Sequence, residues 1–184
     1  MAKDFQIHYI PYIEIFILLL LSVYWDTKNY KIPNKLVLSG ILLGLVTTVF
    51  IQGWMAGVFS MIRILVFMTA LMPLFLLKFL GAGDIKLLAS VGAFFGYKEV
   101  LFIVLYSFIA GGFIGSFVLL ARKNGIERFR KLMGYLKTIF YTMSVPSYPL
   151  DKSDKASFFR FSYAILAGFL LYFIEKIGWI KLFI

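Results

Sequence analysis

The stretch FLGAGDIKLLASVGAFFG, residues 79–96, places one aspartate, Asp84, between two glycines and a long run of apolar side chains. A carboxylate is costly in such surroundings, because an apolar medium disfavours its charged form. The whole chain has the same character: 61% of its 184 residues are hydrophobic, against about 45–50% in soluble domains. This composition predicts an all-α polytopic membrane protein with Asp84 embedded in it.

Six apolar segments predict a bundle of about six transmembrane helices, in which residues 1–184 form a single membrane-embedded domain. The segments are approximately residues 9–25, 36–51, 58–79, 85–97, 100–121 and 157–174. Their lengths and continuous apolar character are typical of membrane helices. The first segment lacks a small-residue cleavage site, and further spans follow it at once, so we expect no cleavable signal peptide.

The basic residues are distributed unevenly between the two sides of these spans. Fourteen of the nineteen Lys and Arg residues fall after the first, third and fifth spans, and four fall on the other side. Arg63 lies within the third span and is expected to snorkel to its outer end. The positive-inside rule places the side with fourteen in the cytoplasm, with both termini outside. We therefore expect the net charge of +10 to serve topology and anionic lipids rather than nucleic acid.

The long cytoplasmic loop at about residues 122–156 has a pattern of its own. Apolar residues recur in it at helical spacing, with arginines and lysines between them. This pattern predicts a basic amphipathic helix that lies on the inner leaflet of the membrane. A helix that binds a partner protein is the alternative.

The residues available for catalysis are few. Cysteine is absent and His8 is the only histidine, which argues against a thiol nucleophile, a Cys-based zinc site and a Ser-His-Asp triad. We expect neither a metal nor a cofactor. Acid–base chemistry must then use the nine Asp and Glu residues. Two of them, Asp26 in YWDTKNYKIPNKL and Asp84 in GAGDIKLL, fall at the cytoplasmic ends of predicted spans.

The depth of Asp84 is the stronger of the two signals. The predicted span at residues 85–97 rises about 20 Å, which is less than the hydrocarbon core of about 30 Å. Asp84 is therefore expected inside the membrane, on a loop that dips in and that Gly81 and Gly83 permit through positive φ and close backbone approach. A helix cap, with or without an ion pair to Lys86, is the simpler alternative.

Asp26 is the weaker signal taken alone, because a solvated charge among lysines explains it equally well. Pro33 restricts the residue before it to extended geometry and can begin the second span, which would fix the exit from the first. Glu14 lies two to three turns further outward and is expected to make a buried polar contact.

DTKNYKIPN at residues 26–34, followed by GAGDIKLLA at residues 81–89, resembles the type IV prepilin peptidases, which are membrane aspartyl proteases of the GxGD class. The resemblance runs from about residue 12 to 170 and includes the late segment YAILAG at residues 163–168. It implies that Asp26 and Asp84 are the catalytic pair and that Gly81 and Gly83 shape the active-site loop. The possible supporting residues are Lys28, Pro33, Asn34, Lys86 and Tyr163.

The resemblance also implies an activity and a place in the cell. The family removes the short basic leader from pilin-like precursors, at the cytoplasmic face of a prokaryotic cytoplasmic membrane. Many bacterial members carry a further domain with paired CxxC motifs and methylate the new N-terminus with S-adenosylmethionine. Because this chain has no cysteine, it looks like a short form with peptidase activity alone.

Three other interpretations stay open at this point. A presenilin-like protease also has a GxGD aspartate, but its pair lies on neighbouring late spans of a longer chain, whereas here Asp26 follows Trp25 at the end of the first span. An ion- or proton-coupled transporter would use Asp26 and Asp84 as ion sites, although no internal repeat supports it. A noncatalytic assembly subunit is the third.

Overall fold

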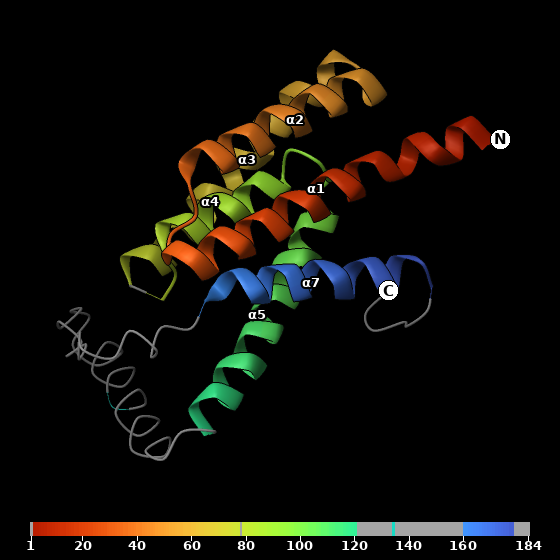
Figure 1. Ribbon diagram of the computed structural model, residues 1–184. Helices are drawn as coiled ribbons and strands as arrows, with labels where there is room; N and C mark the ends of the chain where they lie inside the picture. The colour runs from red at the N-terminus through yellow and green to blue at the C-terminus, as the bar shows by residue number, and fades with distance from the viewer. Residues whose placement is uncertain (1, 78, 121–133, 135–159, 179–184) are drawn as a thin grey trace. The chain divides into compact units, whose positions relative to one another are not determined.

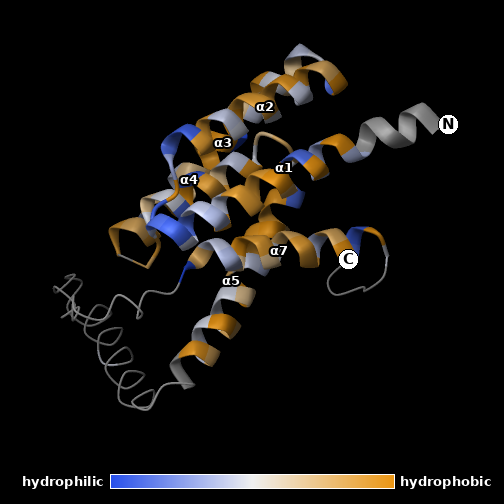
Figure 2. Ribbon diagram, in the orientation of Figure 1, coloured by the Kyte–Doolittle hydropathy of each residue, from blue (hydrophilic) through white to orange (hydrophobic). Residues whose placement is uncertain are grey.

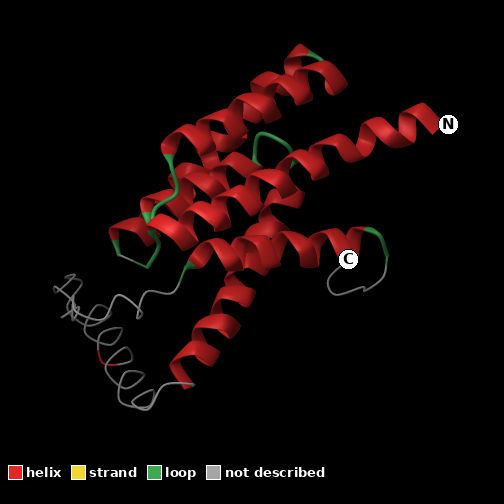
Figure 3. Ribbon diagram, in the orientation of Figure 1, coloured by secondary structure: helices red, strands yellow, loops and turns green. Residues whose placement is uncertain are grey.

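The computed structural model describes residues 2–77, 79–120, 134 and 160–178, and every regular element within these ranges is an α-helix (Figures 1 and 3). The all-α prediction is therefore confirmed. The amphipathic helix predicted at about residues 122–156 lies, apart from Gly134, outside the described residues. The helices are α1 (Ala2–Asn29), α2 (Asn34–Gln52), α3 (Trp54–Leu76), α4 (Ala82–Val91), α5 (Tyr97–Leu120) and α7 (Phe161–Lys176).

Four segments of the described helices are long and apolar enough to cross a membrane, and Figure 2 shows hydrophobic residues along all of them. These candidate spans are Tyr9–Asn29, Asn34–Gln52, Trp54–Leu76 and Tyr97–Val118. With 10 residues, α4 rises only about 15 Å and cannot cross a core of about 30 Å. The fourth span predicted at residues 85–97 is therefore a short helix that ends at Val91, followed by a turn.

The chain divides into two units, Met1–Ala110 with Arg160–Ile184, and Gly111–Phe159. In the first unit α4 packs against α2, α3 and α7, while α1 packs against α2 and α7. Leu87, Leu88 and Val91 of α4 are fully buried, whereas Phe50 and Trp54, where α2 gives way to α3, are largely exposed. The short helix thus forms the core of this unit, and the longer helices keep apolar faces of the kind that lipid covers.

α7 packs on α1 and on α4, the two helices that carry Asp26 and Asp84. It also approaches α5 closely at Gly168. A Cβ atom on Gly168 would lie 2.4 Å from the backbone nitrogen of Ser107. Because that neighbour is backbone and cannot rotate away, only glycine permits this approach.

The C-terminal end of α4 is buried in the protein and hydrogen-bonded by side chains of α2 and α3. Thr48 and Ser60 donate to the carbonyl of Ala93 at 2.8 and 3.0 Å. Arg63 donates through Nε to the carbonyl of Gly92 at 3.1 Å. Backbone groups away from water must find partners within the protein, and these three side chains supply them. Arg63 is only 8% exposed, so the snorkelling prediction is wrong: its guanidinium caps α4.

We expect the substitution Arg63→Met to lower the free energy of unfolding by about 2 kcal/mol, because it leaves the buried carbonyl of Gly92 without its charged donor. Unfolding of the detergent-solubilised protein by a denaturant titration measures this change. Lys98→Met removes an exposed cation and is the matched control, expected to change stability by less than about 0.5 kcal/mol. Equal effects of the two substitutions would contradict a capping role for Arg63.

Candidate active site

Asp26 lies in the last turn of α1 and is 9% exposed. The helix continues to Asn29 and ends where Tyr30 takes a left-handed conformation, with φ 54°. The carboxylate of Asp26 accepts a hydrogen bond from the hydroxyl of Ser162, with 2.5 Å between the oxygens. Ser162 is fully buried in the first turn of α7. The interpretation of Asp26 as a solvated surface charge is therefore wrong.

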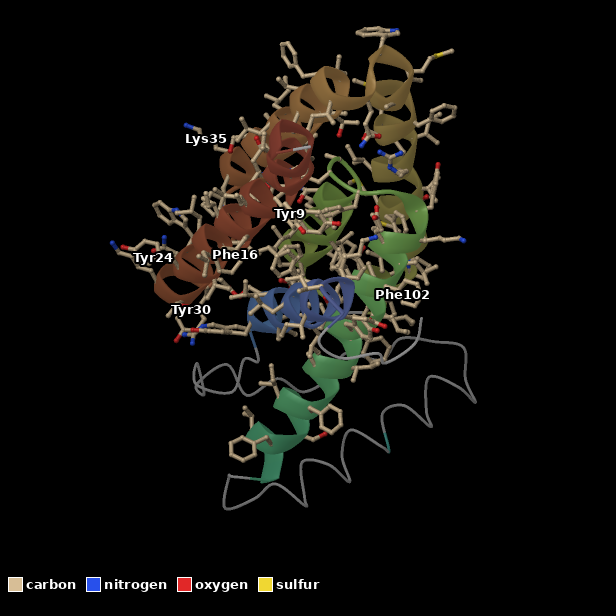
Figure 4. The ribbon with its side chains drawn as sticks, turned by 90° about the vertical axis from the view of Figure 1, so that its right-hand side faces the viewer. Tyr9, Phe16, Tyr24, Tyr30, Lys35 and Phe102 are labelled. Atoms are coloured by element: carbon tan, nitrogen blue, oxygen red, sulfur yellow. The ribbon has the colours of Figure 1, made fainter. Side chains whose placement is uncertain are left out.

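Two further contacts tie the start of α7 to the end of α1. The hydroxyls of Tyr163 and Thr27 lie 2.9 Å apart. Because Thr27 gives its own proton to the carbonyl of Val23, Tyr163 is the donor of this pair. The Arg160 guanidinium lies 4.6 Å from the ring centroid of Tyr30, which Figure 4 shows at the end of α1 near α7. The predicted supporting hydroxyl of Tyr163 thus holds the residue beside Asp26, not an aspartate itself.

Asp84 lies in the first turn of α4, a position different from the one predicted. The helix begins at Ala82, so Gly83 and Asp84 are helical, and the irregular chain ends at Gly81. The amide of Gly81 donates to Oδ2 of Asp84 at 3.3 Å. The simpler alternative of a helix cap is therefore correct, because the carboxylate of Asp84 accepts a hydrogen bond from a backbone amide that has no partner within the helix.

The two glycines of GAGD are explained by space and not by backbone conformation. Gly81 has φ −74° and ψ 152°, which any residue adopts, so the predicted positive φ is wrong. A Cβ on Gly81 would lie 3.0 Å from Oδ2 of Asp84, and one on Gly83 would lie 3.4 Å from Cβ of Ile32. The close approach that the sequence predicts is thus present at both glycines.

The connection between α1 and α2 is held against α4 by a second contact. Lys86 donates to the side-chain oxygen of Asn34 at 3.2 Å, so its partner is Asn34 rather than Asp84. Pro33 precedes the first residue of α2 in extended geometry, with φ −64°. Lys28 lies 6.0 Å from the ring centroid of Tyr24. Of these predicted supporting residues, Asn34 and Lys86 thus join the connection after α1 to α4.

The two carboxyl groups interact through their charges. The pKa of Asp84 is raised to about 6, first by burial and then by the negative charge of Asp26, while the hydrogen bond from Gly81 opposes the shift. A carboxylate only senses another in this way when the two are near each other. Near pH 6 Asp84 is therefore protonated in about half of the molecules, and a group in this state can act as an acid or as a base.

Other carboxylates in the described residues have different surroundings. Glu99 accepts a hydrogen bond from the amide of Gly96 at 2.7 Å, as Asp84 does from Gly81. Glu14 accepts a hydrogen bond from Thr47, 2.8 and 2.9 Å from its two oxygens, which is the polar contact predicted for it. Within the described residues, no cluster of three or more His, Cys, Asp or Glu side chains could hold a metal ion.

Ser162 and Arg160 are not among the residues that the sequence predicts for the site. The last helix is expected from residue 157, which would place Ser162 in its second turn. The structure begins α7 at Phe161, so Ser162 lies at the helix end that meets α1. A small hydroxyl residue next to Tyr163 is the only sequence signal that marks it.

Comparison with known proteins gives two similarities. A protein-family model described as the type IV leader peptidase family matches residues 13–116, a range that contains Asp26 and Asp84. Prepilin peptidase EppA of Methanocaldococcus jannaschii is 27% identical over 172 residues, which cover 88% of this chain and 48% of that relative. The chain thus spans about half the length of the curated relative it matches. No solved structure matches it.

We expect the substitution Asp26→Asn to lower the pKa of Asp84 from about 6, because it removes the neighbouring negative charge. The pKa should stay above the ordinary value, because burial is the larger cause and persists. The infrared band of the protonated carboxyl, assigned by its loss in Asp84→Asn, reports this pKa in a pH titration. Glu14→Gln is the control. It removes a different carboxylate, one hydrogen-bonded to Thr47, and should leave the titration midpoint of Asp84 unchanged. An unchanged midpoint in Asp26→Asn would show that the two carboxyls are not coupled.

Proposed function

The chain belongs to the type IV leader peptidase family, and we propose that it is a membrane aspartyl endopeptidase with Asp26 and Asp84 as its catalytic pair. Its substrates would be pilin-like precursors, from which it removes the short basic leader, as the name of the similar prepilin peptidase suggests. We propose that residues 1–184 act as one peptidase domain without N-methyltransferase activity. The observation that carries the proposal is the match of residues 13–116, which include both aspartates, to the type IV leader peptidase family.

The proposed reaction needs one proton on the pair and one water molecule. The ionised carboxylate takes a proton from water as the water oxygen bonds to the scissile carbonyl carbon. The protonated carboxyl stabilises the developing oxyanion and gives its proton to the leaving amine as the C–N bond breaks. A pKa of about 6 for Asp84 supports this scheme, because a substantial fraction of the molecules then carries a proton on Asp84 near pH 6.

The surroundings of Asp84 support access by a peptide. Gly81 and Ala82 are exposed and Asp84 is partly exposed, whereas Ile85 and residues 87–91 are buried. A scissile bond could therefore reach the first turn of α4 while the apolar segment of the precursor packs against the membrane helices. Gly81 and Gly83 would keep this turn free of side chains.

We propose that the remaining predicted residues act on the site through the backbone. The hydrogen bond between Lys86 and Asn34 would hold the connection that follows α1 against α4. Tyr163 would do the same for the residue after Asp26 through its contact with Thr27. The proposed supporting residues are Lys28, Pro33, Asn34, Lys86 and Tyr163.

The proposed location is a prokaryotic cytoplasmic membrane, with the active site facing the cytoplasm and both termini outside. The four candidate spans support a multi-pass membrane protein. The excess of lysine and arginine on one side supports the orientation, and these residues would contact anionic lipids.

Co-expression with a pilin-like precursor from the same genome tests the activity. We expect wild type to shorten the precursor, and Asp26→Ala and Asp84→Ala each to lower the rate on the order of 10⁴-fold, because each removes half of the acid–base pair. Loss of the leader is followed by electrophoretic mobility and confirmed by mass spectrometry. Glu14→Ala removes a carboxylate from the same helix as Asp26 and should retain cleavage. Full cleavage by either well-expressed aspartate variant would sink the proposed pair.

The orientation has a separate test, because the chain has no native cysteine and single cysteines can be introduced without background. Lys31 lies in the connection after α1, and Trp54 begins α3 at the opposite end of α2; both are exposed. We expect an impermeant thiol reagent to label Trp54→Cys in intact cells and Lys31→Cys only after permeabilisation. The reverse pattern would place the aspartates outside.

A further inference from the structure

We propose that Ser162 is a positioning residue that keeps Asp26 as the charged member of the pair, so that Asp26 takes the proton from water and Asp84 supplies the proton to the leaving amine. This inference rests on the proposed function and states which aspartate is the base and which is the acid. It also brings into the site a residue of α7 that lies beyond the range matched by the family model, residues 13–116.

The contact itself favours charge on Asp26. A hydroxyl that donates to a carboxylate stabilises the charged form, and hydrogen bonds of this kind are short and strong. The oxygens of Ser162 and Asp26 are 2.5 Å apart, and Ser162 is fully buried, so water does not compete for the hydroxyl. Asp26 therefore has a dedicated donor.

The position of Ser162 in its helix acts in the same direction. It is the second residue of α7, after the N-cap residue Arg160 and Phe161. The first turn of a helix carries the positive end of the helix dipole, which stabilises a nearby anion. The Arg160 guanidinium is fixed over the ring of Tyr30 and adds a positive charge at the same end of α7.

Asp84 has the weaker donor. Its hydrogen bond comes from the amide of Gly81 at 3.3 Å, and although it too lies in the first turn of a helix, burial and the charge of Asp26 raise its pKa to about 6. The factors that favour its neutral form thus outweigh those that favour its charge. We therefore assign the proton of the pair to Asp84.

The other charged and titratable groups at this end of the described helices do not reverse the assignment. Lys28 and Lys31 follow Asp26 in the sequence. Lys35 lies in the first turn of α2, and Lys86 follows Asp84 in α4. Their positive charges favour ionisation of both carboxyls and so do not distinguish them. The groups are Tyr24, Lys28, Tyr30 and Lys31, then Lys35, then Lys86, and Arg160 and Tyr163 from α7.

The pH dependence of cleavage by the full-length protein tests the proposal. At pH values below the acid limb of the pH–rate profile, Asp26 also takes up a proton. The pair then has no base, and cleavage stops. Ser162→Ala removes the donor that stabilises the charged form, so this protonation must occur at higher pH. We expect the acid limb to move up by about one pH unit and kcat at the wild-type optimum to fall about tenfold. The alkaline limb, which reports loss of the proton from Asp84, should stay in place.

Ser22→Ala is the matched control. Ser22 is also fully buried, lies on α1, and donates to the carbonyl of Leu18 at 2.8 Å. We expect its limbs to match wild type. Ser162→Thr keeps the hydroxyl and should keep the wild-type acid limb even if the extra methyl group slows the reaction. Ser162→Cys, whose thiol is a weak donor, gives a second, nearly isosteric variant should the alanine protein fail to accumulate.

An unmoved acid limb in Ser162→Ala or Ser162→Cys overturns the proposal, and so does an equal shift in Ser22→Ala. The infrared titration of the carboxyl bands, made without substrate, gives a readout separate from activity. In Asp84→Asn, where Asp26 is the remaining member of the pair, adding Ser162→Ala should move carboxyl protonation to higher pH. This result decides the role of Ser162 even if wild type cleaves no precursor, an outcome that would count against the proposed function alone.

Discussion

A ten-residue helix whose C-terminal end is buried among apolar side chains must find partners for its terminal backbone groups within the protein, and this constraint organises the unit around α4. At the C-terminal end the partners are Thr48, Ser60 and Arg63, which reach the carbonyls of Gly92 and Ala93 from two neighbouring helices. At the N-terminal end the carboxylate of Asp84 binds an amide. The same aspartate therefore has a structural role before any chemistry is asked of it.

Each of the two aspartates is held in position by helices that are distant in the sequence. The capping of α4 by α2 and α3 sets the position of Asp84 along its axis, and the first turn of α7 sets that of Asp26 through Ser162. The connection after α1 closes the arrangement, because Ile32 contacts Gly83 and Asn34 binds Lys86. Two carboxyls that accept hydrogen bonds from different donors are not equivalent. This difference can decide which carboxyl acts as the base and which acts as the acid.

Features encoded by neighbouring residues could be predicted from the sequence, and features that depend on distant residues could not. The apolar runs predicted the long helices, and GAGD predicted an aspartate cap as one alternative, although the helix begins at Ala82 rather than at the predicted residue 85. The end of α4 at Val91 was missed because the next residues, buried in a turn, are as apolar as a helix. The capping by Arg63 was missed because its partner is a backbone carbonyl 29 residues away, and Ser162 because it lies 136 residues from Asp26.

A comparison within the chain shows how far a local pattern determines chemistry. Gly96 and Glu99 repeat the arrangement of Gly81 and Asp84, with a glycine amide bound by an acidic side chain three residues later. Glu99 has a cation, Lys176, 3.7 Å away. Asp84 has no such partner among the described residues, because Lys86 binds Asn34, and its neighbour is a second carboxylate instead. The cap places a carboxyl group at a helix end in both cases, but the charged group beside it differs, a lysine at Glu99 and a second carboxylate at Asp84.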